Sequence, residues 1–229
     1  MSNTIPITQN VRARQLEEAA RFREELRHRG ILCVNVISSP GSGKTALLEA
    51  TARHWKGRVR MGVLVGDIAT NRDAERLTPM VPALQLTTGG ACHLEMNLVT
   101  QGWHAIRQEP IEVLFIENVG NLVCPSSFDL GEHVRVVLLS VTEGDDKPGK
   151  YPKAFRTSDV CVISKTDLLQ YLPFSVDAAV SDARLIRADQ EILQVSAMTG
   201  EGIPEWCQLL EERRAALLRE DIETRITTG

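Results

Sequence analysis

The chain of 229 residues is 43% hydrophobic and 24% charged, which leaves room for one sizeable α/β domain and not for a second complete core. A formal net charge of −4 argues against nucleic acid as the main partner. The opening residues lack a secretion signal, and no stretch approaches the ~18 apolar residues that cross a membrane. We therefore expect a cytoplasmic protein.

The segment 9–29 is rich in Arg, Glu and Ala, and it stops at Gly30, a good helix terminator. Its apolar residues fall at near-helical spacing: Val11, Leu16, Ala20 and Leu26. The pattern predicts an N-terminal amphipathic helix within 1–30, followed by a single domain over 31–229.

Seven apolar, β-branched segments follow, separated by helical patterns. They are 31–38, 59–67, 83–88, 111–118, 134–143, 160–167 and 191–197. Continuous apolar runs indicate strands that are covered on both faces, and the helices between them indicate parallel crossovers. The expected fold is α/β, with a mostly parallel sheet of about seven strands and helices on both faces. Binding residues should lie at the carboxyl ends of the strands.

The stretch SSPGSGKT (38–45) leaves the first predicted strand and enters a helix, as a P-loop does. Its backbone amides are expected to bind nucleotide phosphates: those of Gly41, Ser42, Gly43, Lys44, Thr45 and Ala46. Lys44 would stabilise the transferring phosphate as a catalytic residue, and the Thr45 hydroxyl would bind Mg²⁺. Ser38 stands where the usual pattern has its first glycine, which weakens the motif without breaking it.

Two carboxylates, Asp67 and Glu117, follow apolar strands and should reach the same sheet edge as Thr45. We expect both to complete the Mg²⁺ site and to serve catalysis. Asp73 either caps the following helix or takes part in catalysis, and the pattern leaves both open. In the sequence ENVG, the amide of Gly120 can approach a γ-phosphate, so this loop is a candidate switch.

The stretches VISKTDL and VSAMTGEG resemble the guanine-reading elements of GTPases. Asp167 can accept two hydrogen bonds from guanine, Lys165 can lie along the base, and the Ser196–Ala197 pair can reach the base oxygen. The alternative is that Asp167 is a solvated loop residue. Ser164 stands in place of the usual asparagine, so the prediction of GTP over ATP rests mainly on Asp167.

A second constellation consists of Cys92 and His93, at the start of a predicted helix, and the distant Cys124. Thiolate and imidazole ligands suit nickel or zinc, although the spacing alone leaves core packing equally open. The other cysteines should be buried hydrophobes: Cys33, Cys161 and Cys207. Four histidines show no ligand spacing and are expected at the surface or an edge: His28, His54, His104 and His133.

Taken in order, the blocks SSPGSGKT, GDIATNRDAERL, TTGGACHL, FIENVGNLVCP, SVTEGDDKPGKYP, SKTDL and SAMTGEG resemble HypB, the family of hydrogenase nickel-incorporation GTPases. The similarity runs from about residue 31 to residue 202. It implies a SIMIBI-class P-loop fold and a GTP-dependent homodimer with a nickel or zinc site near its interface. The implied metal ligands are Cys92, His93 and Cys124.

The resemblance further implies that nickel passes to a hydrogenase large-subunit precursor with the help of a HypA-type accessory protein. This chain departs from some family members in three ways. It has no Cys-rich or His-rich metal motif near its start, which argues against metal storage; Ser164 replaces an asparagine; and Asn97 stands where some relatives place a histidine.

The sequence therefore predicts a slow GTPase that uses GTP/GDP and Mg²⁺ and carries Ni²⁺ or Zn²⁺. Slow turnover is expected because no arginine finger can be assigned. One alternative is a related accessory GTPase that serves urease or a cobalamin enzyme. Another is a metal-binding scaffold that does not hydrolyse nucleotide, in which Ser38 and Ser164 mark a degenerate site.

Overall fold

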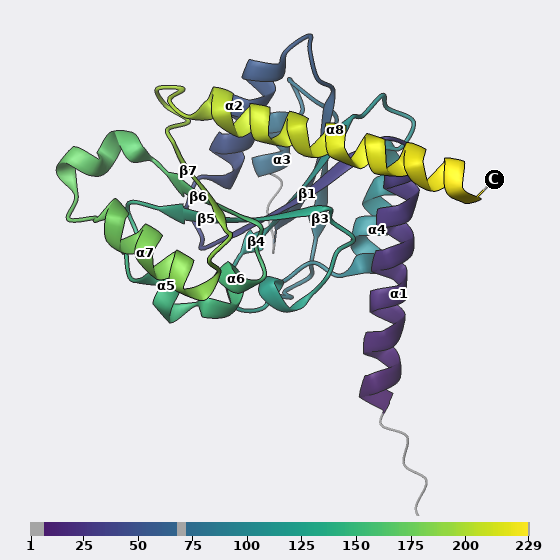
Figure 1. Cartoon of the computed structure of the whole chain (residues 1–229), viewed down its shortest axis with the longest axis horizontal. Helices are drawn as coiled ribbons and strands as arrows, with labels where there is room; N and C mark the ends of the chain where they lie inside the picture. Colours follow the sequence, from purple (N-terminus) through teal and green to yellow (C-terminus); the bar gives the residue numbers. More distant parts are fainter. Residues whose placement is uncertain (1–6, 68–71, 229) are drawn as a thin grey trace, which may run out of the picture.

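The computed structural model describes residues 7–67 and 72–228, and Figure 1 shows one twisted sheet with helices packed around it. The strands are β1 (Leu32–Ser38), β2 (Met61–Asp67), β3 (Ala83–Thr87), β4 (Val113–Gly120), β5 (Val134–Ser140), β6 (Val160–Ser164) and β7 (Glu191–Val195). The α-helices are α1 (Ile7–His28), α2 (Lys44–Trp55), α3 (Arg72–Leu77), α4 (Met96–Ile106), α5 (Lys147–Lys150), α6 (Pro152–Arg156), α7 (Val176–Ile186) and α8 (Ile203–Thr228). Two 3₁₀ turns, η1 (Pro125–Ser127) and η2 (Thr166–Tyr171), complete these elements.

All seven strands pair in parallel, in the order β3-β2-β4-β1-β5-β6-β7. The predicted strand segments and the predicted parallel α/β fold are thus confirmed. Glu117 on β4 lies opposite Val36 of β1 and Val65 of β2. This register brings the ends of the three central strands together at one edge of the sheet.

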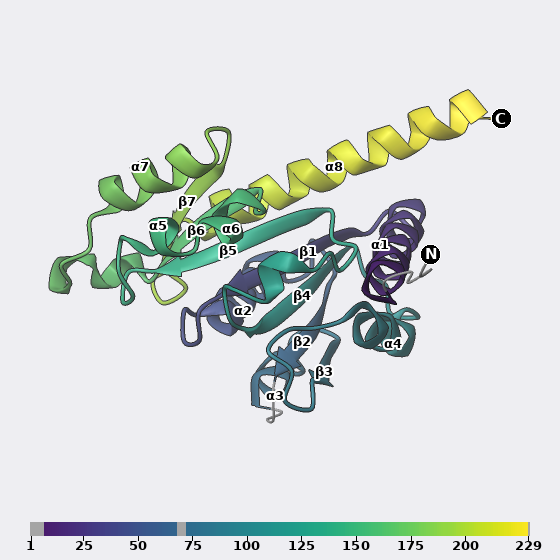
Figure 2. The same ribbon diagram turned by 90° about the horizontal axis from the view of Figure 1, so that it is seen from below.

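Helices cover both faces of the sheet, as Figure 2 shows. On one face, α2, α3 and α8 bury a core around Trp55, Phe115 and Trp206. On the other face, α1 and α4 pack around Trp103, and α6 and α7 pack around Phe155. Strand residues facing both layers are apolar, which explains the continuous hydrophobic runs in the sequence.

The leading helix forms as predicted, but its buried stripe differs from the predicted one. Its buried residues are Ala19, Phe22 and Leu26, whereas Ala20 is exposed and Leu16 is 51% exposed. Figure 1 shows the first turns of α1 projecting beyond the sheet. The side chain of Val11 lies outside the described residues. Gly30 ends the helix in the left-handed region, with φ of 69°.

Over the part of the chain that the structure describes, no helix is long and apolar enough to cross a membrane.

Candidate nucleotide and metal sites

The loop between β1 and α2 has the backbone geometry of a phosphate-binding loop. Gly41 and Gly43 adopt φ of 73° and 96°, in the left-handed region that glycine reaches without strain. Lys44 and Thr45 open α2 and are buried, and Ala46 follows in the same turn. The amides of this first turn have no partner within the helix, so they face the space in front of it.

Ser38 does more than fill the place of a glycine. The ammonium of Lys44 donates a hydrogen bond to Ser38 Oγ at 3.1 Å, and Ser38 Oγ donates to the Ser39 carbonyl at 2.7 Å. The hydroxyl therefore holds the lysine at the sheet edge. Burial lowers the pKa of Lys44, and nearby carboxylates oppose this shift, Glu117 most strongly. Sequence reasoning missed this role, because it treated Ser38 as a tolerated substitution.

Glu117 is the most unusual carboxylate of the site. It is 3% exposed, and its Oε1 accepts a hydrogen bond from the Thr45 hydroxyl at 2.8 Å. Its Oε2 is buried, and it has no hydrogen-bond partner among the residues that the structure describes. Burial raises the pKa of Glu117 to about 7, against the opposing effects of Lys44 and Thr45. A buried oxygen left open beside a threonine hydroxyl is a donor set that suits Mg²⁺.

The other predicted acidic groups lie around this pair. Asp67 ends β2, two residues beyond the position opposite Glu117. Asp73, in the first turn of α3, forms an ion pair with Arg76 at 3.6 Å. The charge of Asp73 raises the pKa of both Lys44 and Glu117, so it lies close to the site.

Gly120 is required by close packing. It pairs with Ser38, and an added Cβ would lie 2.8 Å from Pro40 Cα, which is too close for any side chain. The candidate switch strand therefore touches the phosphate-loop backbone directly.

The predicted base-reading residues gather next to this loop. Ser164 Oγ donates to the Ser42 carbonyl at 2.7 Å, so the serine connects the two loops as the usual asparagine would. Lys165 donates to the Gly41 carbonyl at 2.6 Å. Ser196 Oγ donates to Asp167 Oδ1 at 2.6 Å, which fixes that carboxylate; Ala197 follows Ser196.

Glu143 also contacts the phosphate loop, although sequence reasoning gave it no role. It accepts hydrogen bonds from the Ser42 hydroxyl and, at 3.3 Å, from the Ser140 amide. Its other oxygen lies 3.3 Å from the ammonium of Lys147. The sequence signal for Glu143 is its place in SVTEGDDKPGKYP, one of the blocks that resemble the HypB family.

The distant cysteines come together with the histidine. The Cys92 thiol donates to Cys124 Sγ at 2.7 Å, and Cys92 Sγ lies 3.7 Å from His93 Nδ1. One ligand atom from each residue lies within 4.8 Å of the others. The bond to Cys124 is the main reason that the pKa of Cys92 is raised. The donor atoms fit a thiolate–imidazole metal site.

One expectation about this cluster is wrong: Cys92 and His93 do not start a helix, because α4 begins only at Met96. They lie in the loop before α4, whose double glycine adopts φ of 63° and 103°. Asn97 is exposed, and its side-chain oxygen accepts from the Leu98 amide. It does not join the ligand cluster.

The three remaining cysteines are buried, as predicted: Cys33, Cys161 and Cys207. Among the histidines, His133 differs from the surface positions expected for the group. Its Nδ1 accepts from the Cys33 amide at 2.9 Å and its Nε2 lies 3.2 Å from the Arg23 carbonyl. Burial lowers its pKa to about 4, so it is a neutral connector between α1 and β1.

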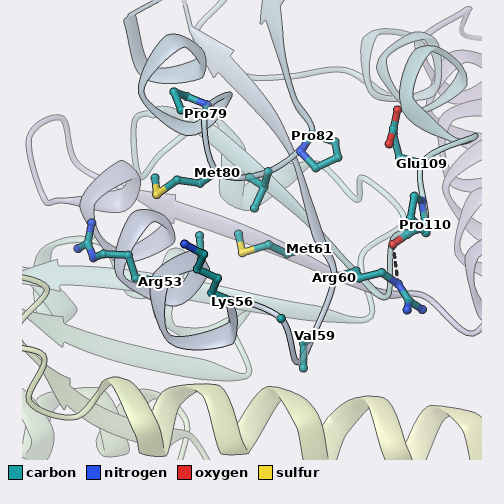
Figure 3. Close-up of a pocket in the computed structure, with 13 residues that line it drawn as sticks. Arg53, Lys56, Val59, Arg60, Met61, Pro79, Met80, Pro82, Glu109 and Pro110 are labelled. Atoms are coloured by element: carbon teal, nitrogen blue, oxygen red, sulfur yellow. Dashed lines mark hydrogen bonds between the residues drawn. The ribbon is translucent and has the colours of Figure 1, made fainter.

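A cavity of about 470 Å³ lies away from these residues (Figure 3). Met61, which starts β2, forms its floor, and Met80 and Pro82 line another wall. The cavity therefore opens at the amino ends of the strands, and no predicted site residue lines it. Ligand sites in parallel sheets lie at the carboxyl ends, where the nucleotide and metal residues gather.

The sequence matches the family model "CobW/HypB/UreG, nucleotide-binding domain" over residues 32–194. Hydrogenase maturation factor HypB of Azotobacter vinelandii is 43% identical over 97% of this chain and 74% of its own length. The HypB of Escherichia coli K12 is 44% identical over 86% of this chain and 69% of its own length.

Solved structures of HypB proteins have the same fold as this chain. HypB from Helicobacter pylori in complex with nickel superposes with a TM-score of 0.85 and 38% identity, covering 89% of this chain and 96% of that one. HypB from Archaeoglobus fulgidus gives a TM-score of 0.81 at 38% identity, covering 88% and 99% of the two chains. The LAO/AO transport system kinase, at 16% identity and a TM-score of 0.52, shares the fold alone. The chain therefore belongs to the HypB family of hydrogenase maturation factors and contains the nucleotide-binding domain of that family.

Proposed function

We propose that the protein is a GTP-hydrolysing metallochaperone of the cytoplasm that binds nickel, or zinc, and assists nickel insertion into a hydrogenase large subunit. It would act as a nucleotide-dependent homodimer with a HypA-type accessory protein, and residues 31–229 would form its single GTPase domain. The observation that carries the proposal is the cluster of Cys92, His93 and Cys124. The nickel complex of the Helicobacter pylori relative supports it.

The nucleotide would bind across the end of β1, with its phosphates on the loop amides and its base near Asp167. Lys44, already directed to the sheet edge by Ser38, would neutralise charge that develops on the transferring phosphate. Ser196 would keep Asp167 oriented toward the base. These groups are held by the protein before the nucleotide arrives, so little reorganisation would precede the reaction.

Mg²⁺, when bound, would stabilise negative charge on the phosphates. Thr45, Asp67 and Glu117 would hold it. The Oε2 of Glu117 supports this assignment, because no described residue hydrogen-bonds to it and a cation would give it a partner. The hydroxyl of Thr45 would turn from Glu117 toward the ion.

At the second site, Cys92 and Cys124 would bind the cargo as thiolates, together with the imidazole of His93. The exposed position of Cys92 would allow the metal to enter and leave. Three protein ligands leave a coordination position open for a receiving protein or a second subunit.

The experiment is a nickel and zinc titration of the wild type and of Cys124→Ala, each with GDP or a GTP analogue, while the mass in solution is measured. We expect tight binding that needs Cys124, and a dimer that forms with the GTP analogue. Metal affinity that depends on neither Cys124 nor nucleotide would overturn the proposal. Cys207→Ala is the matched control, because its thiol is buried away from the site.

A second candidate is service to urease. Two further relatives, from Helicobacter hepaticus and Helicobacter pylori, carry the name "Hydrogenase/urease maturation factor HypB" at 39% and 38% identity. Deletion of the gene should abolish hydrogenase activity under the first proposal. Loss of urease activity, with hydrogenase unaffected, would favour the second.

A further inference from the structure

The imidazole of His93 is held from two sides before any metal binds. Its ring stacks on that of Phe128, with ring centres 3.9 Å apart and planes 12° from parallel. Nδ1 lies on the side of Cys92 Sγ, whereas Nε2 is buried and no residue in the described part of the chain hydrogen-bonds to it. The nearest carboxylate to Nε2 is that of Glu95, at 3.9 Å. Phe128 therefore sets the plane in which Nδ1 faces the two thiols.

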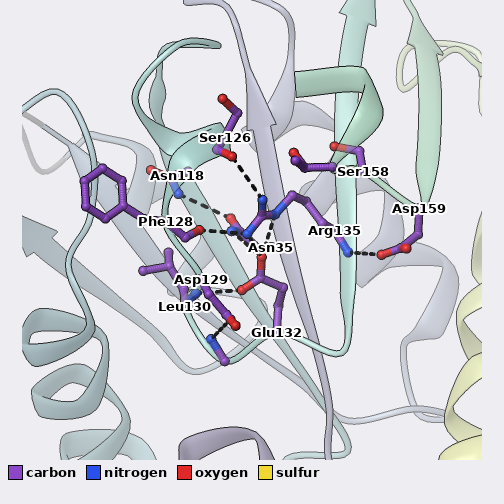
Figure 4. A network of polar contacts seen from close by, with 12 residues as sticks. Asn35, Asn118, Ser126, Phe128, Asp129, Leu130, Glu132, Arg135, Ser158 and Asp159 are labelled. Atoms are coloured by element: carbon purple, nitrogen blue, oxygen red, sulfur yellow. Dashed lines mark hydrogen bonds and ion pairs between the residues drawn. The ribbon is translucent and has the colours of Figure 1, made fainter. Parts of the chain in front are cut away.

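Phe128 is itself fixed by Arg135, whose side chain is only 11% exposed, as Figure 4 shows. Arg135 donates from Nη2 to the Phe128 carbonyl at 2.7 Å and from Nη1 to the Ser126 carbonyl at 3.4 Å. Both carbonyls belong to the turn that follows Cys124. The Cys124 carbonyl accepts a hydrogen bond from the Ser127 amide within this turn. One guanidinium thus holds the turn that carries both a thiol ligand and the stacking ring.

The same contacts continue to the other flank of His93. Arg135 Nε donates to Glu132 Oε1 at 2.6 Å, and that oxygen also accepts from Asn35 Nδ2 at 3.2 Å. Asn35 Oδ1 accepts from Asn118 Nδ2 at 3.3 Å. Asn118 Oδ1 accepts from the amide of Leu94 at 3.4 Å, the residue after His93. The contacts form a closed ring that begins and ends at the histidine.

The inner part of this ring is buried, since Asn35, Asn118 and Glu132 are 0%, 1% and 7% exposed. Polar contacts away from water are strong and directional, so a fully connected set holds one arrangement. A buried ion pair such as Glu132–Arg135 adds little net stability compared with apolar packing, and its best-attested use is to specify structure. Because the pair contacts the turn that follows Cys124, we infer that it specifies the conformation of that turn.

We propose that Phe128 and Arg135 are positioning residues that hold the His93 imidazole and the Cys124 turn ready for a thiolate-binding divalent metal, with Nδ1 as the coordinating nitrogen. The inference rests on the proposed function, because it presumes metal at this cluster. It adds two residues to the site, neither of which ligates. Groups that orient a ligating histidine typically change metal affinity about 10- to 100-fold when removed.

The test measures nickel affinity on the full chain by competition with a coloured chelator, and records the thiolate-to-nickel absorption band. Phe128→Leu should bind about 10- to 100-fold more weakly with an altered band, and Phe128→Tyr should restore both. Phe174→Leu, the same change in an aromatic residue packed far from the cluster, should match the wild type. Arg135→Lys, which loses the planar fork, should also weaken binding.

A double-mutant cycle separates positioning of His93 from general support of the fold. In a His93→Ala background, Phe128→Leu should cause no further loss of affinity. An equal loss in both backgrounds, or no loss in the wild-type background, would overturn the proposal. Circular dichroism and GDP affinity check that each variant folds. If Arg135→Lys does not fold, the comparison of Phe128→Leu with Phe128→Tyr decides the question.

The outcomes for the two proposals differ. Wild type that binds nickel no better than Cys124→Ala would overturn the proposed function, and this inference with it. Nickel binding that needs Cys124 but ignores Phe128 and Arg135 would overturn this inference alone.

Discussion

Two buried glutamates lie in neighbouring regions of the molecule with opposite surroundings. Glu132, beneath the metal cluster, has both oxygens occupied: Oε1 accepts from Asn35 and Arg135, and Oε2 accepts from the Leu130 amide at 2.8 Å. Within residues 7–67 and 72–228, Glu117, at the nucleotide edge, accepts a hydrogen bond only from Thr45 and has one oxygen without a partner. The pKa of Glu117 is raised to about 7 as a result of its burial.

The difference separates a structural carboxylate from one that awaits a ligand. The cost of burying the Glu132 carboxylate is offset by the protein's own groups, because one cation and two amide donors contact it. The burial of Glu117 is incompletely compensated, and native proteins rarely bury such an atom without a reason. Removing the two side chains should therefore have different consequences.

The largest expected effect is on stability. Glu132→Ala should lower the free energy of unfolding by about 3–5 kcal/mol, because it leaves Arg135 buried without its counter-charge. Urea denaturation measures the change. Glu205→Ala, at an exposed position, should shift it by less than about 0.5 kcal/mol. If the two variants were equally stable, Glu132 would not be the structural member of the pair.

Removing Lys44, the cation near Glu117, should change the rate of GTP hydrolysis more than it changes stability. Lys44 donates its hydrogen bond to Ser38 and not to Glu117, so the ammonium remains available to a phosphate. Lys44→Ala should slow GTP hydrolysis about 10²- to 10³-fold, as loss of one transition-state donor does. Phosphate release under saturating GTP measures it, with the exposed Lys56→Ala as the control. Equal rates in wild type and Lys44→Ala would support the scaffold alternative.

The raised pKa of Glu117 should appear as a pH-dependent stability. Between the ordinary value of 4.5 and the folded value of about 7, the folded state binds the proton more tightly than the unfolded state. The free energy of unfolding of the metal-free protein should therefore fall as pH rises through this range, by up to about 3 kcal/mol.

Glu117→Gln should remove that slope, and the difference between the two proteins isolates it. The subtraction cancels His133, whose pKa of about 4 produces the opposite slope. Parallel stability curves for wild type and Glu117→Gln from pH 4.5 to 8 would show that Glu117 is as well compensated as Glu132.

The smallest expected effect concerns a single contact at the nucleotide edge. Ser164→Ala removes the bond to the Ser42 carbonyl and should weaken GDP binding about fivefold, or about 1 kcal/mol. Calorimetric titration measures it, and Ser175→Ala, which changes a distant helix cap, should leave GDP affinity unchanged. A much larger loss would mean that this edge depends on connected polar contacts as the Glu132 region does.

The sequence by itself determined the sheet and predicted the edge at which the candidate site residues gather. Continuous apolar runs between helical patterns favour parallel strands that are buried on both faces, and Gly41 and Gly43 in SSPGSGKT meet a local demand for positive φ. Local chemistry therefore predicted where Lys44, Thr45 and Glu117 would lie.

Other features depend on contacts between residues far apart in the chain, and only the tertiary structure decided them. Cys92 and Cys124 are 32 positions apart and meet because β4 returns the chain beside the loop before α4. The buried stripe of α1 depends on which turns reach the sheet. Likewise, Glu117 and Glu132 are both buried glutamates, and only their neighbours in space give Glu132 partners for both oxygens and Glu117 a partner for one.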